Sequence, residues 1–148
     1  MVRVVVLAIT CFIVFHYFFL PIRVSGISML PTYRDGGFNL VNRVAYRSRE
    51  PQRGDVVGIR AGAGESIMYM KRIIGLPGES VSFHEGRAYI NDDLLQEPYL
   101  KFDCKWEHEP KLLGPDEYYC VGDNRSMPQA DHYEGKIKRD RIVGKVVL

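Results

Sequence analysis

Residues 66–79 read SIMYMKRIIGLPGE, and the prediction of a β fold starts from this segment. Ser66–Ile74 is apolar and ends at the turn sequence Gly75-Leu76-Pro77-Gly78, which predicts a β-strand. Side chains alternate between the two faces of a strand, so one face carries Ile67, Tyr69, Lys71 and Ile73. Burial there disfavours the ammonium and lowers a lysine pKa, which leaves an amine able to accept a proton. The alternative is a lysine whose stem packs while its ammonium reaches water, and alternation alone favours that alternative.

Similar signals lie on both sides of this strand. Short alternating stretches between Gly, Pro and Asp turns predict strands at Phe38–Ala45, Asp55–Arg60, Val81–Phe83, Arg87–Ile90, Glu117–Val121 and Ile142–Val147. His84-Glu85-Gly86 predicts a hairpin turn. The fold class is therefore mainly β, a barrel or folded sheet. The least regular segment, Glu97–Pro115, is expected to be a surface excursion.

An apolar run precedes the β region. Val4–Leu20 contains no formally charged residue, and its length reaches the lower end of a bilayer span. We expect one N-terminal transmembrane helix, with residues 1–22 as anchor and residues 23–148 as a single domain. The alternatives are a cleaved signal peptide and a buried core helix. Positive charges lie on both sides of the run, so they do not decide its orientation.

Composition restricts the partners. Lysine and arginine number 20 against 18 acidic residues, a net charge of +2, and no basic stripe is interleaved with aromatics. We therefore expect no nucleic-acid partner. No Cys-x-x-Cys or His-x-x-x-His spacing occurs, so we expect no metal and no cofactor. Cys11 lies in the apolar run; Cys104 and Cys120 lie downstream, and whether they form a disulfide stays open.

A candidate nucleophile follows the apolar run. Ser28 lies in SGISMLPT, residues 25–32, where Gly26 permits close backbone approach and Pro31 fixes the chain after the turn. A serine hydroxyl attacks well only when a base takes its proton. The alternative is an ordinary turn serine, which is the more common role of serine beside Gly and Pro. His84, His108 and His132 stay open as bases, but none lies in a recognisable triad motif. Lys71 is the other candidate base.

Four segments together resemble the type I signal peptidases. Ser28-Met29-Leu30-Pro31-Thr32 is similar to the family's S-M-x-P-T box, and Arg53-Gly54-Asp55-Val56-Val57 to its R-G-D-V-V strand. Residues 71–79, KRIIGLPGE, resemble the K-R-[IV]-[IV]-G-x-P-G-[DE] box, and Gly122-Asp123-Asn124-Arg125 resembles the G-D-N-R box. The four occur in the family's order and cover the chain from Ser25 to Gly135. The nine-residue lysine box is highly specific.

The resemblance implies a membrane-bound serine endopeptidase with a signal-peptidase-like β domain. It implies that Ser28 is the nucleophile, that Lys71 is the base, and that the Ser28 N–H donates to the oxyanion. It also implies secretory preproteins as substrates, cleaved after small residues. The enzyme would be single-pass in the bacterial cytoplasmic membrane, with its catalytic domain on the outer face. Its partners would be preproteins and the lipid bilayer, and we expect a monomer.

Two departures from the family pattern concern the residues around this dyad. Gly26 occupies the position of a serine that adds a second oxyanion donor in many members. In the last box Pro128, Ala130 and His132 replace a serine, an aspartate and an arginine. Supporting roles are expected for Gly26, Met29, Arg72, Asp123, Ser126 and Asp131. Ser126 or Asp131 would substitute for the missing groups, and Arg72 would pair with Asp123.

Two alternatives remain beside a general signal peptidase. One is a specialised maturation peptidase of the same fold, which would process a pilin-like partner in conjugative transfer. The other is a catalytically inactive, membrane-anchored binding module. The degenerate last box favours both alternatives, whereas the intact Ser28 and Lys71 argue against the inactive module.

Overall fold

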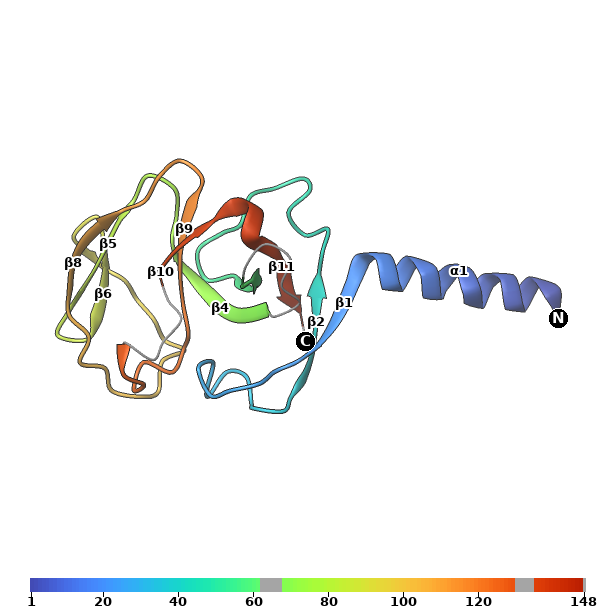
Figure 1. The fold of residues 1–148 in the computed structure, drawn as a ribbon, viewed down its shortest axis with the longest axis horizontal. Coiled ribbons are helices and arrows are strands. Elements are labelled where there is room, and N and C mark those ends of the chain that lie inside the picture. Colours follow the sequence, from blue (N-terminus) through green and yellow to red (C-terminus); the bar gives the residue numbers. More distant parts are fainter. Residues whose placement is uncertain (62–67, 130–134, 148) are drawn as a thin grey trace.

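The computed structural model describes residues 1–61, 68–129 and 135–147. Its elements follow the chain from one helix into a series of strands (Figure 1). They are α1 (Val2–Phe18), β1 (Phe19–Arg23), β2 (Phe38–Asn42), β3 (Val56–Arg60), β4 (Met68–Gly75), β5 (Ser80–His84), β6 (Arg87–Ile90), β7 (Asp93–Leu94), β8 (His108–Leu112), β9 (Glu117–Val121), β10 (Gly135–Lys138), a 3-10 turn (Arg139–Arg141) and β11 (Ile142–Val147). The expected mainly β class is confirmed.

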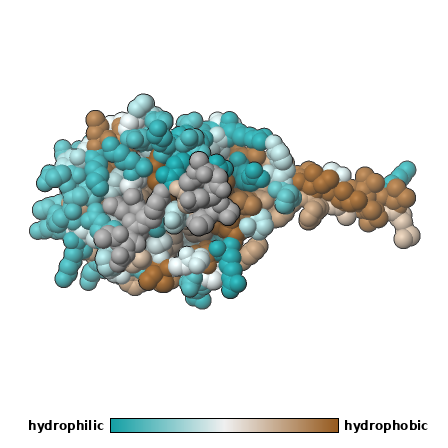
Figure 2. Space-filling view, in the orientation of Figure 1, coloured by the Kyte–Doolittle hydropathy of each residue, from teal (hydrophilic) through white to brown (hydrophobic). Residues whose placement is uncertain are grey.

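Helix α1 projects away from the β domain (Figure 1), and none of its 17 residues is buried. Its surface is apolar along most of its length (Figure 2). Within the described part of the chain, no helix combines the length and the apolar character that a transmembrane span requires. The helix was expected to reach Leu20, but it ends at Phe18, because Phe19–Arg23 pairs along its whole length with β2 as an edge strand.

The larger sheet has seven strands in the order β1-β2-β11-β3-β4-β9-β10. Strand β4 lies between β3 and β9, with Lys71 opposite Val57 and Arg72 opposite Val121. Gly144 of β11 lies against the Asn42 carbonyl of β2, where a Cβ would approach the oxygen to 2.2 Å. A glycine is therefore required where β11 meets β2.

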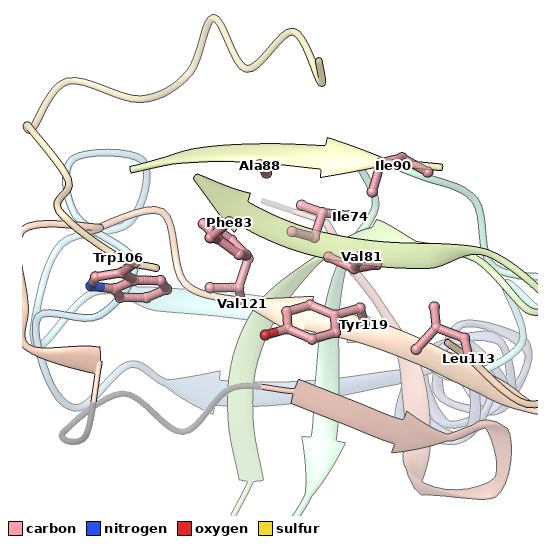
Figure 3. Packing of buried hydrophobic residues seen from close by; sticks show 9 residues of the cluster. All are labelled: Ile74, Val81, Phe83, Ala88, Ile90, Trp106, Leu113, Tyr119 and Val121. Carbon is pink, nitrogen blue, oxygen red and sulfur yellow. The ribbon is translucent and has the colours of Figure 1, made fainter. Parts of the chain in front are cut away.

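The smaller sheet has the order β7-β6-β5-β8. The expected hairpin joins β5 to β6, and its turn residues Glu85 and Gly86 have φ values of 48° and 73°. Paired positive φ values give a tight turn the twist that suits a two-stranded hairpin. A cluster of buried side chains joins the two sheets, with Ile74, Tyr119 and Val121 from the large sheet and Val81, Phe83, Ala88 and Ile90 from the small one (Figure 3).

Most expected strands are present, but two expectations need correction. The expected surface excursion Glu97–Pro115 contains β8, and its Trp106 and Leu113 are buried in the cluster between the sheets. Strand β8 was not expected, because its sequence HEPKL carries charged residues and a proline and does not alternate between apolar and polar residues. Strand β10, Gly135–Lys138, was also not expected, because its GKIK sequence is short and half charged.

Candidate active site

Strand β4 places Lys71 in the protein interior. Lys71 is only 3 % exposed, so the structure buries it, and the solvent-reaching alternative that alternation alone favours is wrong. The same strand face carries Ile73, which lies opposite Cys120 of β9. Burial raises the pKa of the Cys120 thiol to about 12. The lysine therefore lies on a face formed by apolar side chains and one buried thiol.

The next residue of β4, Arg72, points to the opposite face and binds Asp123. Arg72 Nε donates to Asp123 Oδ1 at 2.8 Å and Nη2 donates to Oδ2 at 2.6 Å. The Arg72 side chain is 11 % exposed and that of Asp123 is 0 % exposed. Two parallel bonds between a guanidinium and a carboxylate fix direction as well as distance. The expected pairing of Arg72 with Asp123 is confirmed, and it joins the lysine strand to the last box.

The last box also holds the segment that carries Ser28. Asn124 N–H donates to the Ser28 carbonyl at 2.9 Å, and its side-chain amide donates to the Ile27 carbonyl at 3.0 Å. Thr32 Oγ1 donates to Asp123 Oδ2 at 2.5 Å. The Ser28 turn is thus bonded to residues 123 and 124, and Asp123 is bonded to the neighbour of Lys71. Three segments far apart in the sequence meet at this junction.

The buried side chain of Met29 attaches the Ser28 turn to the hydrophobic core. Its side chain is buried in a cluster with Val24, Val56 and Met70, and this burial fixes the backbone on both sides of Ser28. The supporting role predicted for Met29 stays a prediction, but its position in the core beside β4 gives that role a physical basis.

A cavity of about 210 Å³ opens beside Ser28. Its lining comes from residues 22–26, 28 and 29, from Gly58 of β3, and from Met68, Tyr69 and Met70 of β4. Volumes of this size admit small side chains and a length of extended backbone. The candidate nucleophile thus lines the same cavity as Met68–Met70, the part of β4 that precedes Lys71.

The backbone conformation at position 26 favours glycine. Its φ of 104° lies in the region that favours glycine, although a Cβ there would meet nothing within 4 Å. The Gly26 N–H donates to Asp35 Oδ1 at 2.8 Å. Conformation rather than space thus selects glycine here, and a serine at this position would be strained.

Ser126 acts on the Ser28 turn through Asn124. Ser126 Oγ donates to Asn124 Oδ1 at 2.6 Å, which orients the amide that binds the Ile27 carbonyl. The expectation that Asp131 supports the site falls outside the described residues, as do Ala130 and His132. Pro128 is exposed.

Sequence reasoning missed several residues of this site. Thr32 and Asn124 lie inside two of the family boxes. Their fixed polar positions in those boxes could have indicated a role in the site. Glu97 and Tyr99 lie outside every box, in the expected surface excursion. Nothing local in the sequence marks them, because their partners Arg125 and Arg72 belong to other segments.

Neither a disulfide nor a metal-binding cluster is found in the part of the chain that the structure describes. Cys104 and Cys120 are both free, and they belong to different clusters of the core. Across residues 1–61, 68–129 and 135–147, no three His, Cys, Asp or Glu side chains gather into a group that could hold a metal ion.

Comparison with known proteins identifies the family. The family described as signal peptidase, peptidase S26, matches residues 1–148. A probable signal peptidase I-2 of Synechocystis is 32 % identical over 84 % of this chain, and this chain spans 60 % of that relative's length. Signal peptidase IB of Staphylococcus aureus strain COL is 30 % identical over 98 % of this chain and 84 % of its own.

A solved structure shares the fold. The crystal structure of a signal peptidase I from Enterococcus faecalis V583 aligns with a TM-score of 0.51 over 67 % of this chain and 98 % of that chain, at 24 % identity. The resemblance read from the four boxes is therefore confirmed by independent comparisons of sequence and fold. The chain belongs to the signal peptidase family, peptidase S26.

Proposed function

We propose that this chain cleaves signal peptides from secretory preproteins, with Ser28 as nucleophile and Lys71 as general base. One observation carries the proposal: the Ser28 turn is hydrogen-bonded to Asn124, whose neighbour Asp123 is ion-paired to Arg72, adjacent to a buried Lys71. This arrangement supports a dyad, because it draws the nucleophile turn toward the strand that carries the amine. A base needs no third residue if burial keeps the amine neutral.

The proposed reaction has two steps. Ser28 Oγ attacks the scissile carbonyl carbon while the Lys71 amine takes the hydroxyl proton. The resulting ammonium returns that proton to the leaving amine, and the acyl enzyme forms. A water then attacks the ester carbonyl while Lys71 takes one of its protons. The bond between Ser28 Oγ and the acyl carbon breaks, Lys71 returns the proton to Ser28 Oγ, and the signal peptide leaves with a new carboxyl end. The proton balance closes without a metal or a cofactor.

The Ser28 N–H is proposed as the oxyanion donor. A backbone donor aimed at the developing charge is worth several kcal/mol in enzymes of this kind, on the order of 3 kcal/mol. Gly26 has no hydroxyl to add, and its N–H is engaged by Asp35. The second donor expected from the family pattern is therefore not Gly26.

The cavity beside Ser28 supports an extended substrate with small side chains. Met29, Met68 and Met70 contribute to its walls, and at about 210 Å³ it suits alanine-sized groups at the cleavage site. Among the described residues, β9 pairs with β4 only from Arg72 onward, whereas Met68–Met70 pairs with β3. An extended peptide can add itself beside this part of β4 through main-chain hydrogen bonds.

We further propose that the protein works as a single-pass monomer at the bacterial cytoplasmic membrane, with the catalytic domain on the outer face. Helix α1 supports membrane attachment, since it is largely apolar and its side chains are exposed from Val2 to Tyr17. Ser28 follows Phe18 by ten residues, so at about 3.3 Å per residue it lies at most about 33 Å from the helix end. Such a tether suits a substrate whose own apolar segment is still in the bilayer.

The test is cleavage of a preprotein by the full chain in detergent micelles. Ser28→Ala and Lys71→Met should abolish cleavage and leave the circular dichroism spectrum unchanged. Ser48→Ala and Lys101→Ala, at an exposed serine and an exposed lysine away from the cavity, are the matched controls and should retain activity. Wild-type cleavage rates in either dyad variant would refute the proposed mechanism.

A panel of unrelated preproteins tests the breadth of the activity. A general signal peptidase should cleave most of them, whereas a specialised maturation peptidase would cleave only one or two. A serine-reactive β-lactam distinguishes either enzyme from an inactive binding module, because only an activated Ser28 should be acylated.

A further inference from the structure

The segment Glu97–Tyr99 lies against the last box, although it belongs to none of the family boxes. Arg125 Nη2 donates to Glu97 Oε1 at 2.5 Å, and Nη1 donates to Oε2 at 3.1 Å. The Arg125 side chain is 0 % exposed and that of Glu97 is 5 % exposed. The Arg125 guanidinium also lies over the rings of Phe83 and Trp106, at 5.3 and 5.9 Å from their centroids. The end of the last box is thus fixed to residue 97.

Tyr99 connects this buried pair to the strand that carries Lys71. Its hydroxyl donates to Glu97 Oε1 at 2.5 Å. Its ring lies under the Arg72 guanidinium, 3.9 Å from centroid to Cζ. Burial and the neighbouring Glu97 carboxylate raise the pKa of the Tyr99 hydroxyl, so it stays a donor at neutral pH. Tyr99 thus binds Glu97 through its hydroxyl and contacts the Arg72 guanidinium through the face of its ring.

Arg72 is therefore fixed from three directions. Asp123 binds its Nε and Nη2, the Gly54 carbonyl accepts from Nη1 at 2.8 Å, and the Tyr99 ring covers its face. Arg72 is adjacent to Lys71 on β4, so a shift of Arg72 moves the backbone that carries the base. Asp123 is adjacent to Asn124, which holds the Ser28 turn. The position of Arg72 therefore bears on both members of the dyad.

We propose that Tyr99 is a positioning residue of the signal peptidase reaction. Through its ring face it holds Arg72, and through Arg72 it sets the placement of Lys71 relative to Ser28. Glu97 and Arg125 hold Tyr99 in turn. The inference rests on the proposed Ser28/Lys71 mechanism. A positioning contact of this kind acts on the rate of the chemical step, because displacements near 1 Å can cost about a hundredfold in rate.

The test compares three variants of the full chain in detergent micelles. Tyr99→Leu removes the ring face, Tyr99→Phe keeps the face and loses the hydroxyl, and Tyr89→Leu makes the same change at a half-buried tyrosine of β6. We expect kcat of Tyr99→Leu to fall about 10- to 100-fold with KM within about twofold. Tyr99→Phe should stay within about fivefold of wild type, and Tyr89→Leu should be unchanged.

A second readout separates positioning from substrate binding. The rate at which a serine-reactive β-lactam acylates Ser28 needs the base but no signal-peptide contact. It should fall in Tyr99→Leu by the same factor as kcat and be restored in Tyr99→Phe. A merely structural role would lower the melting temperature and leave the acylation rate of the folded fraction unchanged.

The outcomes decide between the two proposals. A folded Tyr99→Leu with wild-type kcat, or with a change in KM alone, overturns the role of Tyr99 while the dyad stands. A Tyr99→Phe variant as slow as Tyr99→Leu overturns the part played by the ring face. Should Tyr99→Leu fail to fold, Tyr99→Met is measured in its place and judged by the same results. A wild-type chain that neither cleaves preprotein nor reacts with the β-lactam refutes the proposed function itself.

Discussion

Replacing Asp123 with leucine should destabilise the protein strongly, because it leaves the Arg72 guanidinium buried without a counter-charge. The carboxylate is fully buried, and its two bonds to Arg72 measure 2.8 and 2.6 Å. Removing one partner of a buried ion pair costs about 3–5 kcal/mol. For a chain of this length each kcal/mol lowers Tm by about 2–4 °C, so we expect a loss of about 6–20 °C. Removing both charges, in Arg72→Met with Asp123→Leu, should cost less than Asp123→Leu alone.

The assay is a double-mutant cycle by thermal unfolding, followed by circular dichroism of the full chain in detergent micelles. Glu117 and Lys136 form the control pair, since they lie 3.6 Å apart at the surface and should couple weakly. The reasoning is refuted if the costs of Arg72→Met and Asp123→Leu simply add, within about 0.5 kcal/mol. Additivity would mean that the two charges do not depend on one another for their burial.

Three further predictions concern the core. Burial opposes ionisation of Asp55, but its hydrogen bonds, led by that from Lys145 Nζ at 2.6 Å, hold the pKa of this carboxyl below its usual range. Asp55→Asn should therefore lower stability by about 1–3 kcal/mol at neutral pH. In pH-dependent thermal unfolding, the gap to wild type should be complete above about pH 4 and close as pH falls through the lowered pKa. With a pKa of about 12, the Cys120 thiol should resist maleimide in the native protein and react in urea, as mass spectrometry would show. Gly75→Ala should cost about 1–3 kcal/mol in denaturant titration, because its Cβ would lie 2.6 Å from a Val81 methyl.

Much of the candidate site could be predicted from the sequence, partly from local alternation and partly from the four family boxes. The alternation in β4 places Lys71 among apolar neighbours, and the structure buries it. The Arg72–Asp123 pair was predicted from two matching boxes and is present. Tyr99 could not be predicted, because it lies outside the four boxes and no local pattern marks a residue that contacts Arg72 from a distant segment.

The β-rich class, the turn between β5 and β6, and a serine and a lysine suited to the dyad could all be predicted from the amino-acid sequence. The class and the turn depend on side-chain alternation and on turn conformations, which act over a few neighbouring residues. The end of α1 at β1 and the identity of the strands beside β4 became known only from the folded structure. It alone placed Asn124 on the Ser28 turn and Tyr99 under Arg72. Such contacts form when distant segments pack together in one core. The position of each segment then depends on the packing of all the others, which no local pattern encodes.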